Sequence, residues 1–214
     1  MDDVGTVQDS QAQRFVVEPA SEEFLRERFP ERWAQAPFVA NSMRIMARDP
    51  EVTGLMLQLC RAVLRKDRLV PLGLKFLAGH LASMAAGCRY CSVHSVTLAA
   101  HDAGVEVEKI EALWAFETSE LFAESERVVF RWALAAGSVP NAVTREHYEA
   151  LHLFYSDDEI VEIAEVLCLY GWFNRWNDTF MTPLEDIPLE FGQEHLESAG
   201  WKPGRHREAT TSDA

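Results

Sequence analysis

Apolar residues recur at intervals of three and four along most of this chain, a spacing that places them on one face of an α-helix. The segment 49–67 shows the pattern at five positions: Val52, Leu55, Met56, Leu59 and Val63. No segment shows a convincing alternation of apolar and polar residues, which would indicate a β-strand. The sequence therefore predicts an all-α fold.

Signals for helix ends divide the chain into about seven or eight helices joined by short loops. Ser156 and Glu159 have the spacing of a capping box ahead of a long apolar run, which is a strong helix start. Gly87, Gly104 and Gly137 fall where helices are expected to end. The predicted helices cover 22–28, 49–67, 72–86, 88–103, 107–116, 124–136 and 144–153, with one more that begins after Ser156.

The length of 214 residues fits a single domain, and the composition fits a globular protein. Apolar residues make up 48% of the chain and charged residues 25%, so a sizeable core can form. We predict one helical domain over residues 15–202. Residues 1–14 and 203–214 lack apolar periodicity, and we expect them to be mobile tails.

The charge of the chain argues against two classes of partner. It has 20 Lys and Arg against 34 Asp and Glu, a net charge of −14, which favours binding to neither nucleic acid nor an anionic membrane. The acidic N-terminus lacks the features of a secretory signal and predicts a cytoplasmic location. Lys75, His80 and three glycines interrupt the apolar stretch 69–88, which predicts a buried helix rather than a membrane span.

The stretch GCRYCSVHS carries three residues that can support chemistry: Cys88, Cys91 and His94. If a helix begins just after Gly87, Cys91 shares a face with each of the other two, and the imidazole is better placed to serve Cys91 than Cys88. Free amide hydrogens and the macrodipole at a helix start favour a thiolate. One thiolate can attack an oxidant, and the second sulfur can then close a disulfide.

Two other interpretations of the cysteine pair stay open. Zinc accepts ligands of all three types, but no fourth ligand is evident, and we predict no metal and no cofactor. The two thiols can also be inert packing residues. The remaining cysteines, Cys60 and Cys168, lie in apolar helical stripes, where a free cysteine behaves as a small hydrophobic residue, and we expect both to be inert.

A second group of polar residues follows the apolar run LCLYGWF. Asn174, Asn177 and Asp178 have three-and-four spacing and therefore align along one helical face. They form either a solvated helix end or a group that holds the active-site helix or lines a subunit interface.

Three motifs in order resemble the AhpD-like, or carboxymuconolactone decarboxylase-like, superfamily of all-α proteins. GCRYCSVHS is similar to the CRYCxxH form of a peroxidase-related subgroup, and FETSELFAESER (116–127) and FNRWND (173–178) are similar to its downstream motifs. The resemblance covers roughly residues 35 to 185. It implies an AhpD-like helical bundle with the CxxC pair at the start of a central helix.

The resemblance also implies an activity. Alkylhydroperoxidase members are antioxidant oxidoreductases that reduce hydroperoxides with the cysteine pair, which forms a redox-active disulfide and is regenerated by a thiol or dithiol reductant. Carried over by position, Cys91 would be the peroxidatic residue, Cys88 the resolving residue and His94 part of the proton relay. Family members assemble as homo-oligomers, which we expect here too.

Two positions depart from the alkylhydroperoxidase pattern. The histidine lies three residues after the second cysteine rather than four, with Ser95 at the expected place, a shift that the CRYCxxH subgroup shares. The relay glutamate, twelve residues before the first cysteine, is replaced by Phe76, which cannot accept a proton. His80 is a candidate substitute, provided that two helices fold back on each other at the glycine before the first cysteine. Candidates for surrounding groups are Ser95, Asn174 and Asp178.

Two alternative functions follow from these departures. The chain can be a non-catalytic helical oligomer whose CxxC is structural or binds a metal. It can also perform non-redox chemistry on a small acid, as the decarboxylase name of the superfamily suggests, in a pocket lined by His80 and His94.

Overall fold

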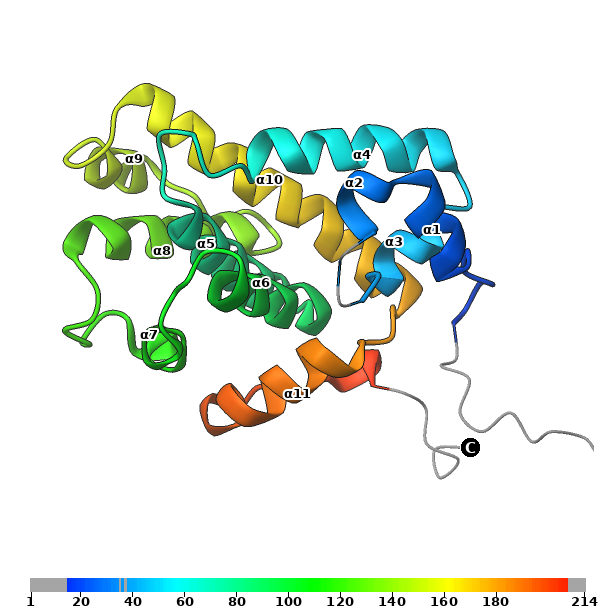
Figure 1. Cartoon of the computed structure of the whole chain (residues 1–214). Helices are drawn as coiled ribbons and strands as arrows, with labels where there is room; N and C mark the ends of the chain where they lie inside the picture. The colour runs from blue at the N-terminus through cyan, green and yellow to red at the C-terminus, as the bar shows by residue number, and fades with distance from the viewer. Residues whose placement is uncertain (1–14, 35, 37, 208–214) are drawn as a thin grey trace, which may run out of the picture.

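The computed structural model describes residues 15–34, 36 and 38–207, and within these ranges every regular element is a helix. Figure 1 shows the resulting helical bundle, which confirms the predicted all-α class. Eight helices fall in the predicted ranges: α1 (Glu22–Arg28), α4 (Pro50–Val63), α5 (Leu72–Ala86), α6 (Arg89–His101), α7 (Val107–Glu111), α8 (Glu124–Gly137), α9 (Arg145–Leu151) and α10 (Asp157–Phe180).

Three further α-helices were not predicted: α2 (Pro30–Trp33), α3 (Asn41–Met46) and α11 (Asp186–His195). The first two are too short to show a helical period. The third contains Pro188 and Gly192, which weaken a helical pattern. Three short 3₁₀ helices complete the described elements: η1 (Leu113–Ala115), η2 (Glu197–Ala199) and η3 (Gly204–His206).

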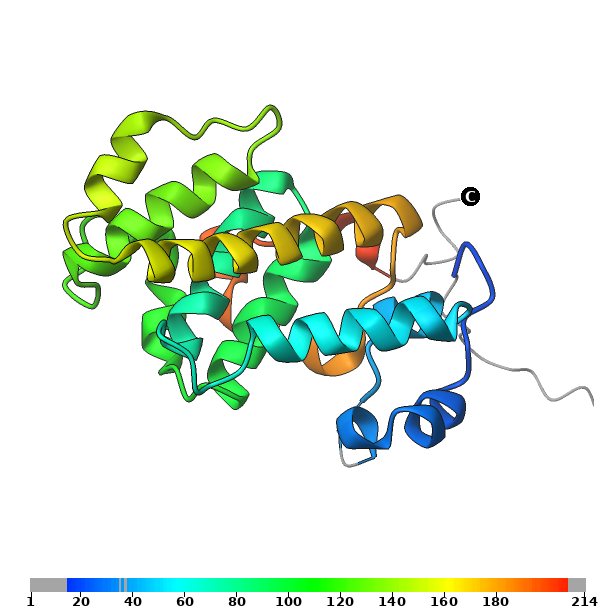
Figure 2. The ribbon, with the colours of Figure 1, turned by 90° about the horizontal axis from the view of Figure 1, so that it is seen from above.

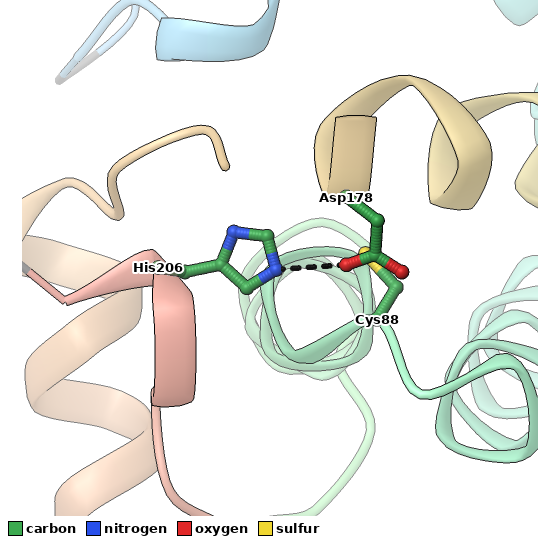
Figure 3. A group of neighbouring side chains, drawn as sticks. All are labelled: Cys88, Asp178 and His206. Carbon is green, nitrogen blue, oxygen red and sulfur yellow. Dashed lines mark hydrogen bonds and ion pairs between the residues drawn. The ribbon is translucent and has the colours of Figure 1, made fainter. Parts of the chain in front are cut away.

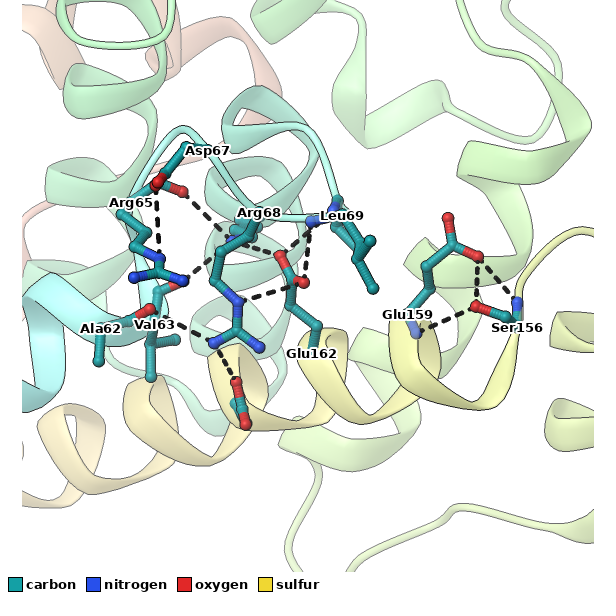
Figure 4. Close-up of polar contacts among 12 residues, drawn as sticks. Ala62, Val63, Arg65, Asp67, Arg68, Leu69, Ser156, Glu159 and Glu162 are labelled. Atoms are coloured by element: carbon teal, nitrogen blue, oxygen red, sulfur yellow. Dashed lines mark hydrogen bonds and ion pairs between the residues drawn. The ribbon is translucent and has the colours of Figure 1, made fainter.

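The start of α10 follows the predicted capping box. The Glu159 backbone N–H donates to the Ser156 hydroxyl at 3.4 Å, and the Glu159 carboxylate accepts from the Ser156 backbone N–H at 2.8 Å (Figure 4). These two bonds satisfy amide groups that have no partner within the helix. The longest helix of the described chain, which runs beside α4 (Figure 2), therefore begins where the sequence predicts.

Helix α5 is the centre of the bundle and packs against α6, α8 and α10 (Figure 1). Eleven of its fifteen residues are buried, as expected for a helix that is apolar on every side. At Gly79 the backbone of α5 approaches the Tyr170 ring of α10 so closely that a Cβ atom would collide with it. The apolar stretch around α5 is thus a buried helix, and none of the described helices has the length and apolar character to cross a membrane.

The turn from α5 to α6 sets the position of the cysteine pair. Gly87 has φ of 83°, in the left-handed region that glycine adopts without steric cost, and its N–H closes α5 by donating to the Met84 carbonyl. Helix α6 starts two residues later and folds back along α5. The predicted reversal at this glycine and the predicted CxxC at a helix start are both confirmed.

The C-terminal segment folds onto α6, and η3 lies within the range 203–214 that the sequence predicts as a tail. The Trp201 indole N–H donates to the Ser92 hydroxyl of α6 at 3.2 Å, and the Leu184 N–H donates to the His206 carbonyl at 2.9 Å. Because these contacts involve single residues rather than a periodic apolar face, the sequence pattern missed them. The predicted N-terminal tail, 1–14, and residues 208–214 lie outside the described part of the chain.

A buried ion pair ties α5 to α10. The Lys75 ammonium lies 2.6 Å from the Glu162 carboxylate. Arg68 approaches the same carboxylate at 3.2 Å, as Figure 4 shows. Backbone N–H groups of Leu69 and Val70 also donate to it. Burial opposes ionisation, but the bonds from Lys75 and the two amides outweigh it and hold the pKa of Glu162 below its usual value. The loop between α4 and α5 is thereby fixed to α10.

Replacing Glu162 with Gln is expected to lower the free energy of unfolding by about 3–5 kcal/mol, because Lys75 would remain buried without its counterion. Urea denaturation measures the loss. Glu165→Gln is the matched control: it removes the more exposed carboxylate that pairs with Arg68, and should cost less than about 1 kcal/mol. Equally small losses in the two variants would contradict a stabilising role for the buried pair.

Candidate active site

Cys88 and Cys91 lie at the first turn of α6 as free thiols. Cys88 is the N-cap residue, and its sulfur accepts the Cys91 backbone N–H at 3.5 Å. Both side chains are buried, with 0% and 4% of their surface exposed. The sulfur of Cys88 therefore faces the positive end of the helix dipole, which favours its thiolate.

The imidazole at the Cys88 sulfur belongs to His206, from the C-terminal segment. Figure 3 shows Cys88, Asp178 and His206 converging from the start of α6, the end of α10 and η3. The Cys88 sulfur lies within 4.8 Å of a ring nitrogen of His206, and the His206 Nε2 lies 3.1 Å from the Asp178 carboxylate. Its Nδ1–H donates to the Thr182 carbonyl at 2.8 Å. His206 is thus held between a sulfur, a carboxylate and a backbone carbonyl.

These contacts separate the acidities of the two thiols. Hydrogen bonds from the Cys91 thiol, from His206 and from the Cys91 backbone N–H outweigh burial and lower the pKa of Cys88 to about 6. Burial, together with donation to Cys88, raises the pKa of Cys91. Burial also opposes the charged form of His206, but its bonds to Cys88, Thr182 and Asp178 prevail and raise its pKa. The site therefore stabilises a Cys88 thiolate beside a His206 imidazolium.

The polar face predicted on α10 is largely buried. The Asn177 side chain donates to the Cys91 sulfur at 3.2 Å, and Asn174 is 4% exposed. Asp178 contacts His206. Asn177 and Asp178 thus contact residues at or near the cysteine pair, whereas Asn174 is buried without a described bond to α6. Buried polar atoms without a hydrogen-bond partner remain there, namely the Asn177 side-chain oxygen and both polar atoms of the Asn174 amide.

The predicted relay histidine, His94, pairs with a carboxylate. Its Nε2 lies 2.6 Å from Glu185, whose carboxylate also accepts from the Tyr90 hydroxyl at 2.7 Å and from the Asn41 backbone N–H. The Tyr90 and His94 rings stack with centroids 4.2 Å apart. Burial of Glu185 is outweighed by the charge and hydrogen bond of His94, so the pKa of the carboxyl group is lowered. The described hydrogen bond of His94 thus joins it to Glu185 and not to Cys91.

The other predicted relay and surrounding groups hold helices together. His80 bonds through Nδ1 to the Ser92 carbonyl at 2.9 Å, and burial lowers its pKa to about 4, so it is neutral at pH 7. Ser95 donates to the Phe76 carbonyl at 2.6 Å and lies 2.8 Å from the Tyr170 hydroxyl. Neither His80 nor Ser95 has a described bond to a cysteine sulfur.

Sequence reasoning missed two residues of this site, His206 and Glu185. His206 lies in a polar segment without periodicity, so no sequence pattern indicates it. Glu185 precedes α11 between two prolines, Pro183 and Pro188, and nothing in its neighbourhood links it to His94, which is 91 residues away. Only the folded chain brings them to the cysteines.

The two cysteines outside the motif differ in exposure. Cys60 is partly buried, and burial raises its pKa to about 11, which agrees with the prediction that it is inert. Cys168 faces solvent on α10 rather than the apolar stripe in which it was predicted. Its neighbours in the sequence of α10 are buried apolar residues, so the sequence pattern predicts a core position for Cys168 as well.

Comparisons with known proteins give matches among solved structures. No protein-family model and no curated protein matches the sequence. The structure of a cysteine-to-alanine variant of the debrominase Bmp8, in complex with 2,3,4-tribromopyrrole, has 26% identity and a TM-score of 0.77, covering 86% of this chain and 99% of that chain. An uncharacterized peroxidase-related protein from Ralstonia eutropha JMP134, an alkylhydroperoxidase AhpD core, has 20% identity and a TM-score of 0.70, covering 83% and 94%.

A protein of unknown function from Agrobacterium tumefaciens, ATU0492, has 24% identity and a TM-score of 0.58, covering 65% of this chain and 97% of that chain. The helical architecture and the structural matches agree with each other. The chain has an AhpD-like fold, as the resemblance of its motifs implies.

The Cys88 thiolate is expected to form as the pH rises through about 6, so that the sulfur is protonated in acid and ionised at neutral pH. Ultraviolet thiolate absorbance of the reduced protein measures this midpoint. His206→Gln should move it to higher pH, because the thiolate loses a hydrogen bond from a cation. His195→Gln is the control, since His195 bonds Glu111 instead. An ordinary cysteine midpoint in the unmodified protein, or one that His206→Gln leaves unchanged, would contradict the assignment.

Proposed function

We propose that this protein is a thiol-dependent oxidoreductase that reduces hydroperoxides with electrons from Cys88 and Cys91. The supporting observation is the surroundings of the Cys88 sulfur at the start of α6, where it accepts the Cys91 backbone N–H at 3.5 Å and lies within 4.8 Å of a ring nitrogen of His206. A thiolate is the nucleophilic form of cysteine. We assign attack to Cys88 and resolution to Cys91, the reverse of the roles that the resemblance implied, because the groups that stabilise a thiolate surround Cys88.

In the first step, the Cys88 thiolate attacks the terminal oxygen of the hydroperoxide. An S–O bond forms, the O–O bond breaks, and the sulfur is oxidised to a sulfenic acid while the peroxide is reduced. The alkoxide that leaves takes the proton of the His206 imidazolium and becomes an alcohol. Asp178, whose side chain is 30% exposed, is the member of this cluster that solvent reaches.

In the second step, the Cys91 sulfur attacks the sulfenic acid on Cys88. An S–S bond forms, and the hydroxyl group leaves with the Cys91 proton as water. Asn177 donates to the Cys91 sulfur and orients it. A thiol or dithiol reductant then reduces the disulfide by exchange and returns two electrons and two protons to the site.

We assign the relay role to His94 and Glu185. In this chain Phe76 stands at the position of the family's relay glutamate, and we assign the role of the missing carboxylate to Glu185. Glu185 accepts a hydrogen bond from Tyr90 and contacts His94. The Tyr90 ring lies between the two histidines, with centroid distances of 4.2 Å to His94 and 5.9 Å to His206. His94, with 14% of its side chain exposed, exchanges protons with solvent in this scheme.

One comparison favours a second candidate substrate. Bmp8 is a debrominase, and its cysteine-to-alanine variant is complexed with 2,3,4-tribromopyrrole. We therefore propose a brominated aromatic ring as the alternative substrate of the same two thiols. Replacing bromine by hydrogen consumes two electrons and releases bromide, and formation of one disulfide from two thiols supplies both electrons and the hydrogen.

We also propose that the protein forms a homo-oligomer, as the resemblance implies. Large apolar side chains are exposed on α4 and α10, which pack against each other (Figure 2). They are Val52, Leu55, Leu59, Val161 and Trp172. Burial of such side chains against another copy would remove apolar surface from water.

Anaerobic titration with cumene hydroperoxide tests the proposal. The reduced protein should carry Cys168→Ser, which removes the exposed thiol. About two thiols per chain should be consumed, and mass spectrometry should find a Cys88–Cys91 disulfide. Cys88→Ser should abolish the reaction, whereas Cys91→Ser should leave a sulfenic acid on Cys88 that dimedone traps. His206→Gln should slow the first step by about 100-fold or more, since it removes the proton donor.

A parallel titration with 2,3,4-tribromopyrrole distinguishes the two substrates. Disulfide formation with release of bromide, and no reaction with the hydroperoxide, would favour the second candidate. Cys60→Ser is the matched control and should react like the parent protein. Thiols that remain unchanged with both substrates would contradict the proposed function, and a trapped sulfenic acid on Cys91 would reverse the assigned roles.

A further inference from the structure

We propose that Cys88, His206 and Asp178 form a binding site for a zinc ion that competes with oxidation of the cysteine pair. The sequence offered a different ligand set, Cys88, Cys91 and His94, which lacked a fourth member. Folding brings together three groups from separate segments, and their candidate ligand atoms all lie within 4.8 Å of one another (Figure 3).

The distances and ligand types suit zinc. Ligand atoms bound at 2.0–2.1 Å in a tetrahedral site are about 3.3 Å apart, and His206 Nε2 already lies 3.1 Å from the Asp178 carboxylate oxygen. The Cys88 sulfur lies within 4.8 Å of a ligand atom of each of these two residues, so a small inward movement brings all three groups to one ion. Thiolate, imidazole and carboxylate are the three side-chain types that zinc binds in proteins.

The orientation of His206 is that of a metal ligand. Its Nδ1–H donates to the Thr182 carbonyl at 2.8 Å, which fixes the tautomer and leaves Nε2 to bind the ion. Histidines that bind metals in proteins almost always make this second hydrogen bond. The Leu184 N–H holds the His206 backbone through its carbonyl, so both ends of the residue are fixed.

The charges of the three groups balance the ion. One thiolate and one carboxylate supply two negative charges to Zn²⁺, and the imidazole binds neutral after it releases its Nε2 proton. Cys88 and His206 are buried, while 30% of the Asp178 side chain is exposed and gives the ion a way in. We assign three protein ligands and leave the fourth position to water, as in zinc sites that keep an open position.

Zinc at this site would occupy the sulfur that the proposed function uses for attack. The bound ion and the Cys88–Cys91 disulfide are therefore mutually exclusive. Zinc would protect the reduced pair from hydroperoxide, and oxidation would release the ion. The inference adds a ligand to the proposed active site, but the binding itself requires no turnover and can be measured without an oxidant.

Zinc titration of the reduced, metal-free protein, under anaerobic conditions and with a chromophoric chelator as competitor, tests the site. The Cys168→Ser background removes the exposed thiol. One equivalent should bind. Loss of a group that only orients a metal ligand weakens binding by roughly 10–100-fold. Asp178→Asn and His206→Gln should each weaken zinc binding by more than this, because each removes a ligand. Co²⁺ as an optical probe should show a thiolate charge-transfer band that Cys88→Ser abolishes.

His195→Gln and Cys60→Ser are the matched controls and should keep the affinity, because neither residue lies at the site: His195 bonds Glu111, and Cys60 is on α4. Loss of binding in these two variants, with Asp178→Asn and His206→Gln unaffected, would overturn the ligand set. Absence of zinc binding in the parent protein would overturn the site, even if its thiols form the disulfide. Circular dichroism of each variant checks that it is folded. Zinc should protect the thiols from hydroperoxide in proportion to the fraction of sites that it occupies, and a chelator should reverse this protection.

Discussion

The approach of the Cys88 sulfur to the His206 imidazole, within 4.8 Å, is the contact on which the site depends. Both groups are buried, and charges removed from water are stable only when each has partners. The sulfur has Cys91 as its second partner, and the imidazole has Asp178 and Thr182. The proposed thiolate reactivity and the proposed zinc site both depend on this one contact.

The rest of the fold serves to hold the two ends of that contact. The left-handed turn at Gly87 ends α5 and places Cys88 as the N-cap residue of α6. The Lys75–Glu162 pair fixes α10 against α5, and α10 in turn supplies Asn177 and Asp178. A bundle built around one buried helix thereby brings three distant segments to a single sulfur.

Local features of the site could be predicted from the sequence, and distant ones could not. The bounds of α1 and α5, the helix start at Ser156 and the placement of Cys88 depend on residues within a few positions of one another, so spacing indicates them. His206 and Glu185 reach the site through contacts between segments far apart in the chain, and neither belongs to a periodic pattern. The same reason explains why the zinc ligand set and the partner of His94 were not predicted.

The protonation state of the His206 ring tests the central claim most directly. Nitrogen-15 NMR of the reduced protein should find the pKa of the His206 ring above the usual value of a histidine, because its interactions with Cys88, Thr182 and Asp178 raise the pKa of the imidazole despite its burial. Cys88→Ser should lower that pKa, since the serine hydroxyl carries no charge at neutral pH. A His206 pKa at or below the usual value in the unmodified protein, or an equal pKa in Cys88→Ser, would contradict the thiolate–imidazolium pair.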